Sequence, residues 1–258
     1  NQANKFGYTP FGNACREGRM QIVKLLLNDE RIDVNRANQW GETPFFFACE
    51  KGYLEIVELL LSDKRVDINK TNNYGQTPFY IVCEKRDITM MKLLLCDKRV
   101  DINNVNNINQ ANNYGCTLFY SACFNGDIEI VKLLLNDKRI DINKANYLGQ
   151  TPFWISCDEG RIEIIEYIIA SGKQVNVNIK DKNGKTAMEI ARKRENEEKG
   201  RWEPEQGFQE RKIRYGKIVE LIESFEKNPI ETRFKLRLKH GLIGKIQFHL
   251  FIFIYFFF

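Results

Sequence analysis

Apolar residues recur with helical spacing in short segments of the chain, and the stretch from Glu55 to Leu61 shows the pattern clearly. Ile56, Val57, Leu60 and Leu61 repeat at helical spacing, with Glu55 and Glu58 between them. This arrangement predicts a short amphipathic helix whose polar face looks outward. A helix of this length does not persist alone in water, so neighbouring segments must supply its packing.

A first helix is predicted just before it by the residues at its two ends. Thr43 suits a helix N-cap, Pro44 suits the first helical position, and Gly52 can supply the left-handed conformation of a C-cap. After the second helix, Val66 and Ile68 alternate with polar residues, and an Asn- and Gly-rich stretch follows. This pattern predicts a projecting hairpin rather than a third helix.

The whole unit recurs along the chain, marked each time by a Gly, any residue and a Thr. The spacings between the threonines are 34, 34, 40, 34 and 35 residues. Such a period is typical of stacked solenoid units, in contrast to an enzyme with one catalytic pocket. The paired residues are Gly7 and Thr9, Gly41 and Thr43, Gly75 and Thr77, Gly115 and Thr117, Gly149 and Thr151, and Gly184 and Thr186.

The period divides the chain into repeats. Residues 1–8 match the end of a preceding repeat, so we interpret the sequence as a fragment. The divisions that follow are 9–42, 43–76, 77–116, 117–150 and 151–185, then a C-terminal capping repeat at 186–226 with a charged insertion at 192–216, and a poorly ordered or artefactual tail at 227–258.

Three irregularities interrupt the period. Arg86 stands where the other repeats have Gly, and forcing a side chain to positive φ costs about 1 kcal/mol. An Asn-rich tip at 103–113 makes this loop six residues longer than the others, which favours an internal replication slip over a selected binding loop. The insertion 192–216 delays a second helix to 217–222, and its charge and single Trp202 favour a solvated segment.

These motifs resemble the ankyrin repeat. Residues 41–52, Gly-Glu-Thr-Pro-Phe-Phe-Phe-Ala-Cys-Glu-Lys-Gly, are similar to that family's G-x-T-P-L-H-x-A-A-x-x-G pattern, and the likeness covers most of residues 4–190. The resemblance implies an all-α repeat solenoid of stacked helix-turn-helix units with projecting β-hairpin loops. The loop at 136–143 carries one extra residue. The hydrogen bond that the family's His makes is expected to be lost, because other residues stand at the His position. They are Gly12, Phe46, Tyr80, Tyr120 and Trp154.

The resemblance also implies that a partner docks on a concave surface built from hairpin tips and first helices. Mapped by motif, this candidate site comprises Lys5, Phe6, Tyr8, Arg16, Glu17, Gln39, Trp40, Glu42, Glu50, Lys51, Asn73, Tyr74, Gln76, Glu84, Lys85, Asn113, Tyr114, Cys116, Phe124, Asn125, Tyr147, Leu148, Gln150, Asp158 and Glu159. The large residue before each tip Gly is either a binding anchor or a ring packed on its own loop, with Trp40 the sharpest candidate anchor.

Charge and cysteine content change this picture little. The net charge is +5, with 39 basic and 34 acidic residues interleaved, which favours a solvated surface. Cys15, Cys49, Cys83, Cys123 and Cys157 occupy one repeated core position, and both histidines lie near the C-terminus, so no metal site and no cofactor are expected. Reduced core cysteines favour an intracellular, cytoplasmic protein.

No catalytic motif competes with a binding role. We therefore expect a non-catalytic scaffold that binds another protein, with no small-molecule substrate. Two alternatives stay open: a recognition arm of a longer chain with a ligase, kinase or channel module, and, less favoured, polyanion binding through the basic segment 233–245. The apolar stretch 248–258 is too short for a membrane span, so a membrane partner is expected only if it is genuine.

Overall fold

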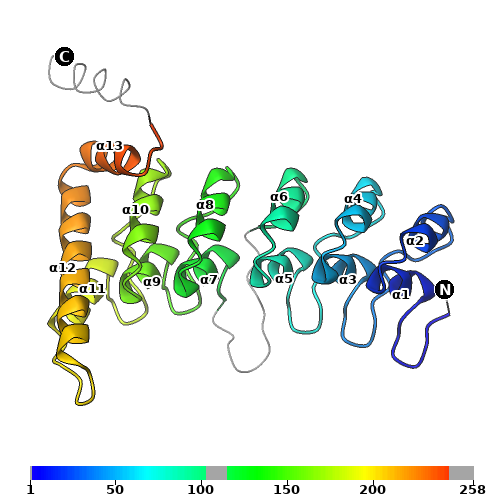
Figure 1. Cartoon of the computed structure of the whole chain (residues 1–258), viewed down its shortest axis with the longest axis horizontal. Helices are drawn as coiled ribbons and strands as arrows, with labels where there is room; N and C mark the ends of the chain where they lie inside the picture. Colours follow the sequence, from blue (N-terminus) through cyan, green and yellow to red (C-terminus); the bar gives the residue numbers. More distant parts are fainter. Residues whose placement is uncertain (1, 103–114, 244–258) are drawn as a thin grey trace. The chain divides into compact units, whose positions relative to one another are not determined.

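The computed structural model describes residues 2–102 and 115–243, and in these two ranges the protein forms thirteen helices and no β-strand (Figure 1). The chain divides into two compact units, Asn1–Leu118 and Phe119–Phe258. The predicted long tip at 103–113, the candidates Asn113 and Tyr114, and the apolar stretch 248–258 lie outside the described residues. The all-helical repeat fold predicted from the sequence is confirmed.

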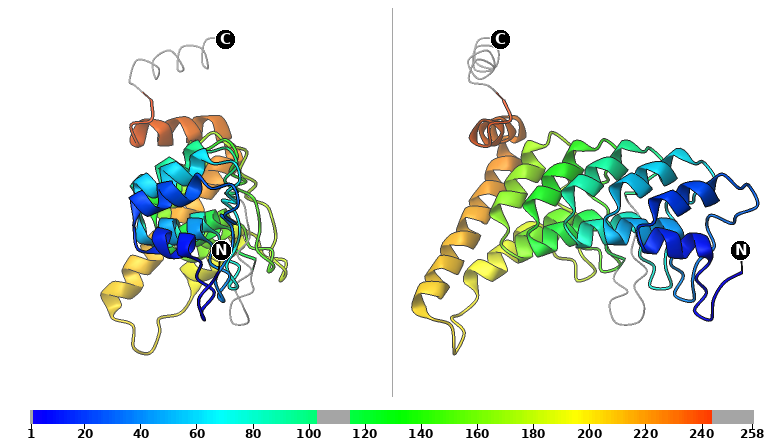
Figure 2. Two further views of the ribbon diagram at one scale, coloured as in Figure 1. Left: turned by 90° about the vertical axis from the view of Figure 1, so that its right-hand side faces the viewer. Right: turned by 45° about the vertical axis from the view of Figure 1, so that its right-hand side comes forward.

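The first unit consists of three helix pairs joined by projecting loops. The first helices pack side by side, α1 against α3 and α3 against α5, and the second helices form a parallel row (Figure 2). Its helices are α1 (Pro10–Arg16), α2 (Met20–Leu27), α3 (Pro44–Lys51), α4 (Leu54–Ser62), α5 (Pro78–Glu84) and α6 (Ile88–Cys96).

The second unit continues the pattern and then departs from it. Two helix pairs come first, and α11 then packs against both α9 and the long helix α12, while α13 packs against α10 and α12. Its helices are α7 (Leu118–Asn125), α8 (Ile128–Asn136), α9 (Pro152–Asp158), α10 (Ile162–Ala170), α11 (Ala187–Asn196), α12 (Glu205–Lys227) and α13 (Pro229–Lys239).

The repeated threonines begin the first helices, as predicted. The Thr43 hydroxyl accepts a hydrogen bond from the Phe46 N–H at 3.1 Å, and Thr9, Thr77 and Thr151 cap their helices in the same way. Thr186 forms a reciprocal capping box with Glu189, whose carboxylate accepts from the Thr186 N–H at 2.8 Å. Each cap satisfies a backbone donor that the first turn leaves without an intrahelical partner.

The two helices of each pair are separated by a residue at positive φ. Gly52 has a φ of 75°, as expected for a left-handed C-cap, and Arg86 adopts the same conformation with a φ of 57°. The prediction that Arg86 occupies a position at positive φ is therefore confirmed, and the cost of placing a side chain there stays a prediction.

The five repeated cysteines are buried and free, and their packing is that of a small apolar residue. Burial raises the pKa of the Cys15 thiol to about 12 and that of Cys123 also to about 12. The same desolvation holds the pKa of Cys49, Cys83 and Cys157 well above the usual range of a thiol. These thiols stay protonated and unreactive at neutral pH.

The described loops carry no strand, although Val66 and Ile68 are buried as the alternation predicted. Instead of a backbone ladder, an asparagine side chain joins three of these loops to the loop that follows. Asn69 donates to the Arg99 carbonyl at 2.7 Å and accepts from the Asp101 N–H at 2.9 Å. A side-chain amide thus pairs the backbone groups that a strand would otherwise pair.

An arginine in the lengthened loop adds a second connection between repeats. Arg65 donates to the Leu27 carbonyl at 2.7 Å, at the end of the preceding repeat's second helix, and Arg99 reaches Leu61 in the same way. Asp63 holds the Arg65 guanidinium at 2.6 Å, which lowers the pKa of this carboxyl. The residue added to the family pattern therefore lies in a turn that bonds one repeat to another.

The aromatic residues at the family's His position retain more hydrogen bonding than expected. The Trp154 indole N–H donates to the Lys185 carbonyl at 3.1 Å, and the Tyr120 hydroxyl donates to the Gln150 side chain at 3.1 Å. The expectation of a lost hydrogen bond is wrong at these two repeats, because indole and phenol carry a polar group beyond the ring.

The C-terminal region is more helical than the sequence suggested. The second helix of the last repeat begins at Glu205 rather than near 217, and α11 extends to Asn196, so about two thirds of the segment interpreted as a solvated insertion is helix. Buried Tyr215, Ile218 and Phe225 fix its packing. Residues 229–239, within the tail expected to be poorly ordered, form α13, which buries Thr232 and Leu236.

Candidate functional site

Most of the described loop tips are closed by an asparagine that the sequence analysis did not single out, and Asp181 accepts the corresponding backbone hydrogen bonds in the last tip. Asn72 accepts from the backbone N–H of Tyr74 and of Gln76, both at 3.0 Å, and its amide donates to the Gln76 side chain at 3.0 Å. Asn38 and Asn146 make the same contacts in their loops. Their exact recurrence at the position three before the tip Gly is the sequence signal that could have identified them.

This geometry explains three candidate site residues structurally. Glu42, Gln76 and Gln150 each accept a hydrogen bond from the tip asparagine, at 2.8, 3.0 and 3.0 Å. Their side chains are half-buried and directed toward their own loops. These side chains stabilise the conformation of the tips, so they contribute to partner binding only indirectly.

Neighbouring tips are also bonded to each other. The Asn73 N–H donates to the Trp40 carbonyl at 2.8 Å, and the Asn73 side chain donates to the Gln39 carbonyl at 2.9 Å. In the second unit, the Lys182 N–H donates to the Leu148 carbonyl at 2.8 Å. The tips within a unit therefore form a row with fixed spacing, which is a preorganised surface for recognition.

An aromatic cluster occupies the first two tips. The Phe6 and Trp40 rings are stacked with centroids 6.3 Å apart, and Tyr8 lies 6.1 Å from Trp40 and 5.4 Å from Phe47. Arg16 covers the Tyr8 ring at 4.4 Å. Trp40 is still 37% exposed, so its ring both packs on its neighbours and faces solvent.

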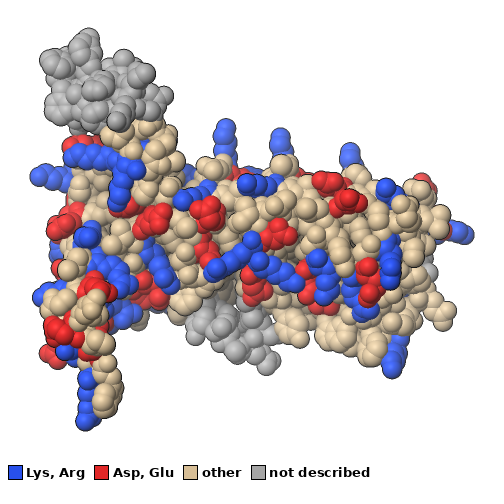
Figure 3. Space-filling model, viewed as in Figure 1, with Lys and Arg blue, Asp and Glu red and all other residues tan. Residues whose placement is uncertain are grey.

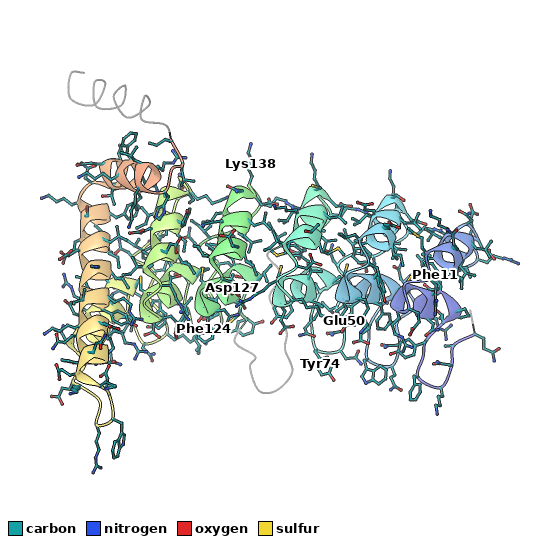
Figure 4. The ribbon with its side chains drawn as sticks, in the orientation of Figure 1. Phe11, Glu50, Tyr74, Phe124, Asp127 and Lys138 are labelled. Carbon is teal, nitrogen blue, oxygen red and sulfur yellow. The ribbon has the colours of Figure 1, made fainter. Side chains whose placement is uncertain are left out.

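Tyr74 differs from Trp40 because its ring makes no aromatic contact within the described residues. It is 47% exposed and projects from the tip between α4 and α5 (Figure 4). A large ring held at a bonded tip with so little packing is the clearest candidate anchor of the first unit.

The second unit presents exposed apolar residues at corresponding places. Phe124, on α7, is 47% exposed (Figure 4). Tyr147 and Leu148 are exposed at the next tip. Asn125 is exposed beside Phe124. Asp158 is committed elsewhere, because its carboxylate accepts from Arg194 at 2.7 Å and its carbonyl accepts from the Tyr215 hydroxyl at 2.6 Å.

The charged candidates on the first helices are partly paired with one another. Arg16 bonds Glu17 at 2.7 Å, and Glu50 lies 3.4 Å from Lys51 and 3.8 Å from Lys85. Glu84 is exposed on the last turn of α5, and Glu159 is half-buried directly after the end of α9. Both signs of charge alternate along the visible face, so neither unit displays there a patch of one sign (Figure 3).

The remaining chemistry of the described residues is sparse. They contain no cluster of three or more residues able to hold a metal ion. No helix among them is both long enough and apolar enough to cross a bilayer. In the basic segment after residue 232, Lys235 pairs with Glu231 and Lys239 with Glu166, each at 2.6 Å, which leaves less positive charge for a polyanion.

Comparison with known families and structures bears on this surface. The family model described as "Ankyrin repeats (3 copies)" matches residues 1–72 and 64–146, and the model described as "Ankyrin repeat" matches residues 148–182. Together they cover more than two thirds of the chain. No curated protein matches it.

Solved structures share the fold. The ankyrin repeat domain of Bcl-3, a member of the IkappaB protein family, is 20% identical with a TM-score of 0.65, over 73% of this chain and 80% of that one. The ankyrin repeat protein EF0377 is 25% identical with a TM-score of 0.62, over 83% and 98%. A chain in the complex of the Bdellovibrio bacteriovorus endopeptidase Bd0816 with the immunity protein Bd3460 is 24% identical with a TM-score of 0.56, over 84% and 99%.

Proposed function

Because the chain belongs to the ankyrin repeat family, we propose that it is a non-catalytic scaffold that binds another protein through its loop tips and first helices. Ankyrin repeats generally mediate protein–protein interaction, and proteins of the family are typically not enzymes. The Bd0816 structure, a complex of two proteins, is consistent with this role. The free, buried cysteines support an intracellular location.

The observation that carries the proposal is the set of exposed apolar side chains on bonded tips and first helices. Tyr74 and Phe124 each leave 47% of their surface in water. The tips are fixed by hydrogen bonds, so a partner that covers these rings gains apolar burial without ordering the loops. Aromatic residues placed in this way are the usual energetic anchors of protein interfaces.

Trp40 is a weaker test of the site than Tyr74. Its ring stacks on Phe6 and lies against Tyr8, so Trp40→Ala removes contacts within the protein as well as any contact with a partner. We expect this variant to lower both the melting temperature and the affinity. Tyr74→Ala should lower the affinity alone.

The proposal is tested by isolating a partner with the full chain and then measuring affinities with purified proteins. Tyr74→Ala and Phe124→Ala are each expected to weaken binding about 30-fold, the effect of an anchor worth about 2 kcal/mol. Trp202→Ala is the matched control, because Trp202 is 88% exposed but belongs to the connection between α11 and α12 and to none of the loop tips before the first helices. Affinity that depends on Trp202 and is unchanged in both other variants would refute the proposed face.

A further inference from the structure

Among the described residues, three asparagines hold an extended backbone segment in the same way. Asn35 donates to the Arg65 carbonyl and accepts from the Asp67 N–H, both at 2.7 Å. Asn69 repeats these two contacts with residues 99 and 101. Asn143 repeats them with the Gln174 carbonyl at 2.7 Å and the Asn176 N–H at 2.9 Å.

The segments that these amides hold share a pattern. The residue between the two bonded backbone groups is a valine each time, and Val66 and Val100 are buried at 4% exposure. The residue after the valine is aspartate in two segments and asparagine in the third. The recognised unit is therefore an extended tripeptide with a central β-branched residue followed by a polar or acidic one.

Asn178 is the next member of this series, and its side chain is unoccupied. It follows Asn143 by 35 residues at the same place in the repeat. Its backbone N–H donates to the Asn176 side chain at 3.0 Å, as the Asn143 N–H donates to Asp141 at 3.0 Å, so the local turn is the same. The Asn178 side chain is exposed and makes no hydrogen bond within the described residues.

Asn178 opens on a groove of about 730 Å³ between the segment 174–178 and the junction of α12 with α13. Val175, Val177 and Phe225 supply apolar lining, and Glu226 and Arg233 supply one charge of each sign. The Arg233 Nε is buried without a hydrogen bond, although its terminal nitrogen donates to the Lys173 carbonyl at 3.0 Å. A buried donor without a partner is rare in folded proteins and marks a place for an acceptor.

We propose that this groove, which is separate from the loop tips, binds an extended segment of a partner protein with the pattern basic, β-branched, acidic. The Asn178 amide donates to the carbonyl before the β-branched residue and accepts from the N–H after it, as the three other asparagines do. The β-branched side chain covers the apolar lining. Arg233 and Glu226 favour a segment that carries an acidic and a basic side chain.

The chain itself supplies a defined probe, the capped peptide Lys-Arg-Val-Asp-Ile-Asn with the sequence of residues 64–69. Titrated into the full-length protein and followed by NMR, it is expected to shift the signals of residues 174–178. Asn178→Ala is expected to weaken binding about tenfold, since two hydrogen bonds are lost. The same peptide N-methylated at its Asp lacks the N–H that Asn178 accepts and should bind correspondingly less.

Asn28→Ala is the matched control, because Asn28 is also exposed, makes no side-chain hydrogen bond among the described residues and lies outside the groove. Its affinity for the peptide should equal that of the unchanged protein. Tyr74→Ala should also bind the peptide normally, which separates this groove from the proposed tip surface.

Three results would overturn the proposal. The first is no binding of the peptide, and the second is equal binding by Asn178→Ala. The third is dimerisation of the chain without peptide, lost in Asn178→Ala, because the groove would then belong to an interface between two copies. Sedimentation equilibrium of both proteins measures this last outcome.

Discussion

The repeats and the C-terminal helices α11–α13 are held together by different kinds of contact. In the repeats, asparagine and arginine side chains bond to backbone groups 30 to 38 residues away, and the same contact recurs from one repeat to the next. In the C-terminal helices, side chains that occur once make the connections, such as Arg194 with Asp158 and the Tyr215 hydroxyl with the Asp158 carbonyl.

This difference shows how a repeat array can end. A repeated contact needs a following repeat as its partner, so the last repeat requires another means of covering its apolar face. The long helix α12 covers this face and buries Ile218 and Phe225. At the end of α13, the side chains of Lys239 and of His240, which follows it, form hydrogen bonds with the Glu166 carboxylate at 2.6 and 2.9 Å. Periodicity specifies the repeats, whereas the end is specified by individual residues.

The largest expected effect comes from opening the C-terminal packing. Ile218 is fully buried on α12, the helix that packs against α10, α11 and α13. Ile218→Ala should lower the free energy of unfolding by about 3 kcal/mol, because it leaves a cavity. Urea unfolding measures the change, and Ile213→Ala, an exposed position on the same helix, should change little. Equal losses in the two variants would contradict the role assigned to α12.

A smaller effect is expected from breaking one asparagine connection. Asn69→Ala removes two hydrogen bonds between consecutive loops and should lower the free energy of unfolding by about 2 kcal/mol. Asn28→Ala, the exposed asparagine without side-chain bonds, is the control for urea unfolding. A loss no greater than that of the control would mean that helix packing alone connects the repeats.

Relief of the strained junction should act in the opposite direction. Arg86→Gly removes the Cβ contact that makes a φ of 57° costly and should raise the free energy of unfolding by up to about 1 kcal/mol. Gly52→Ala, at the corresponding site with a φ of 75°, should lower it by a similar amount. Thermal unfolding of both variants checks the pair, and the same sign of change in both would be inconsistent with strain.

The smallest effect is a pH dependence specific to the repeat loops. Hydrogen bonds from Arg65 and Arg139 lower the pKa of Asp63 and Asp137. The folded state thus binds these protons less tightly than the unfolded chain, so the stabilisation is complete above about pH 4 and is lost as the pH falls further. The double variant Asp63→Asn and Asp137→Asn should show a shallower loss of stability between pH 5 and 3 in urea unfolding. An unchanged slope would assign the acid sensitivity to other groups.

Much of the repeat fold could be predicted from the sequence, because its signals are local. Thr43, Pro44 and Gly52 act within a few residues of where they stand, and each takes the conformation predicted for it. The length of helix α12 was underestimated because its buried residues, such as Tyr215 and Ile218, are separated in the sequence by many charged side chains that extend into solvent.

The candidate site was harder to predict than the fold. Motif position alone could not distinguish Gln76, which serves its own loop, from Tyr74, which projects from it. The distinction depends on side-chain hydrogen bonds that form only when Asn72 folds back on the tip. The groove at Asn178 could not be seen either, because it requires the position of α13.

Five of the repeats carry a buried cysteine at the same core position, and the reactivity of this thiol can report how often its repeat opens. A thiol that is sealed from water and held protonated reacts with an alkylating reagent only while its helix pair is transiently open. The order in which these buried thiols are alkylated would rank the repeats by local stability, without any substitution in the protein. The thiols to compare are those of Cys15, Cys49, Cys83, Cys123 and Cys157. Cys96, which is exposed, would react at once and calibrate the reagent.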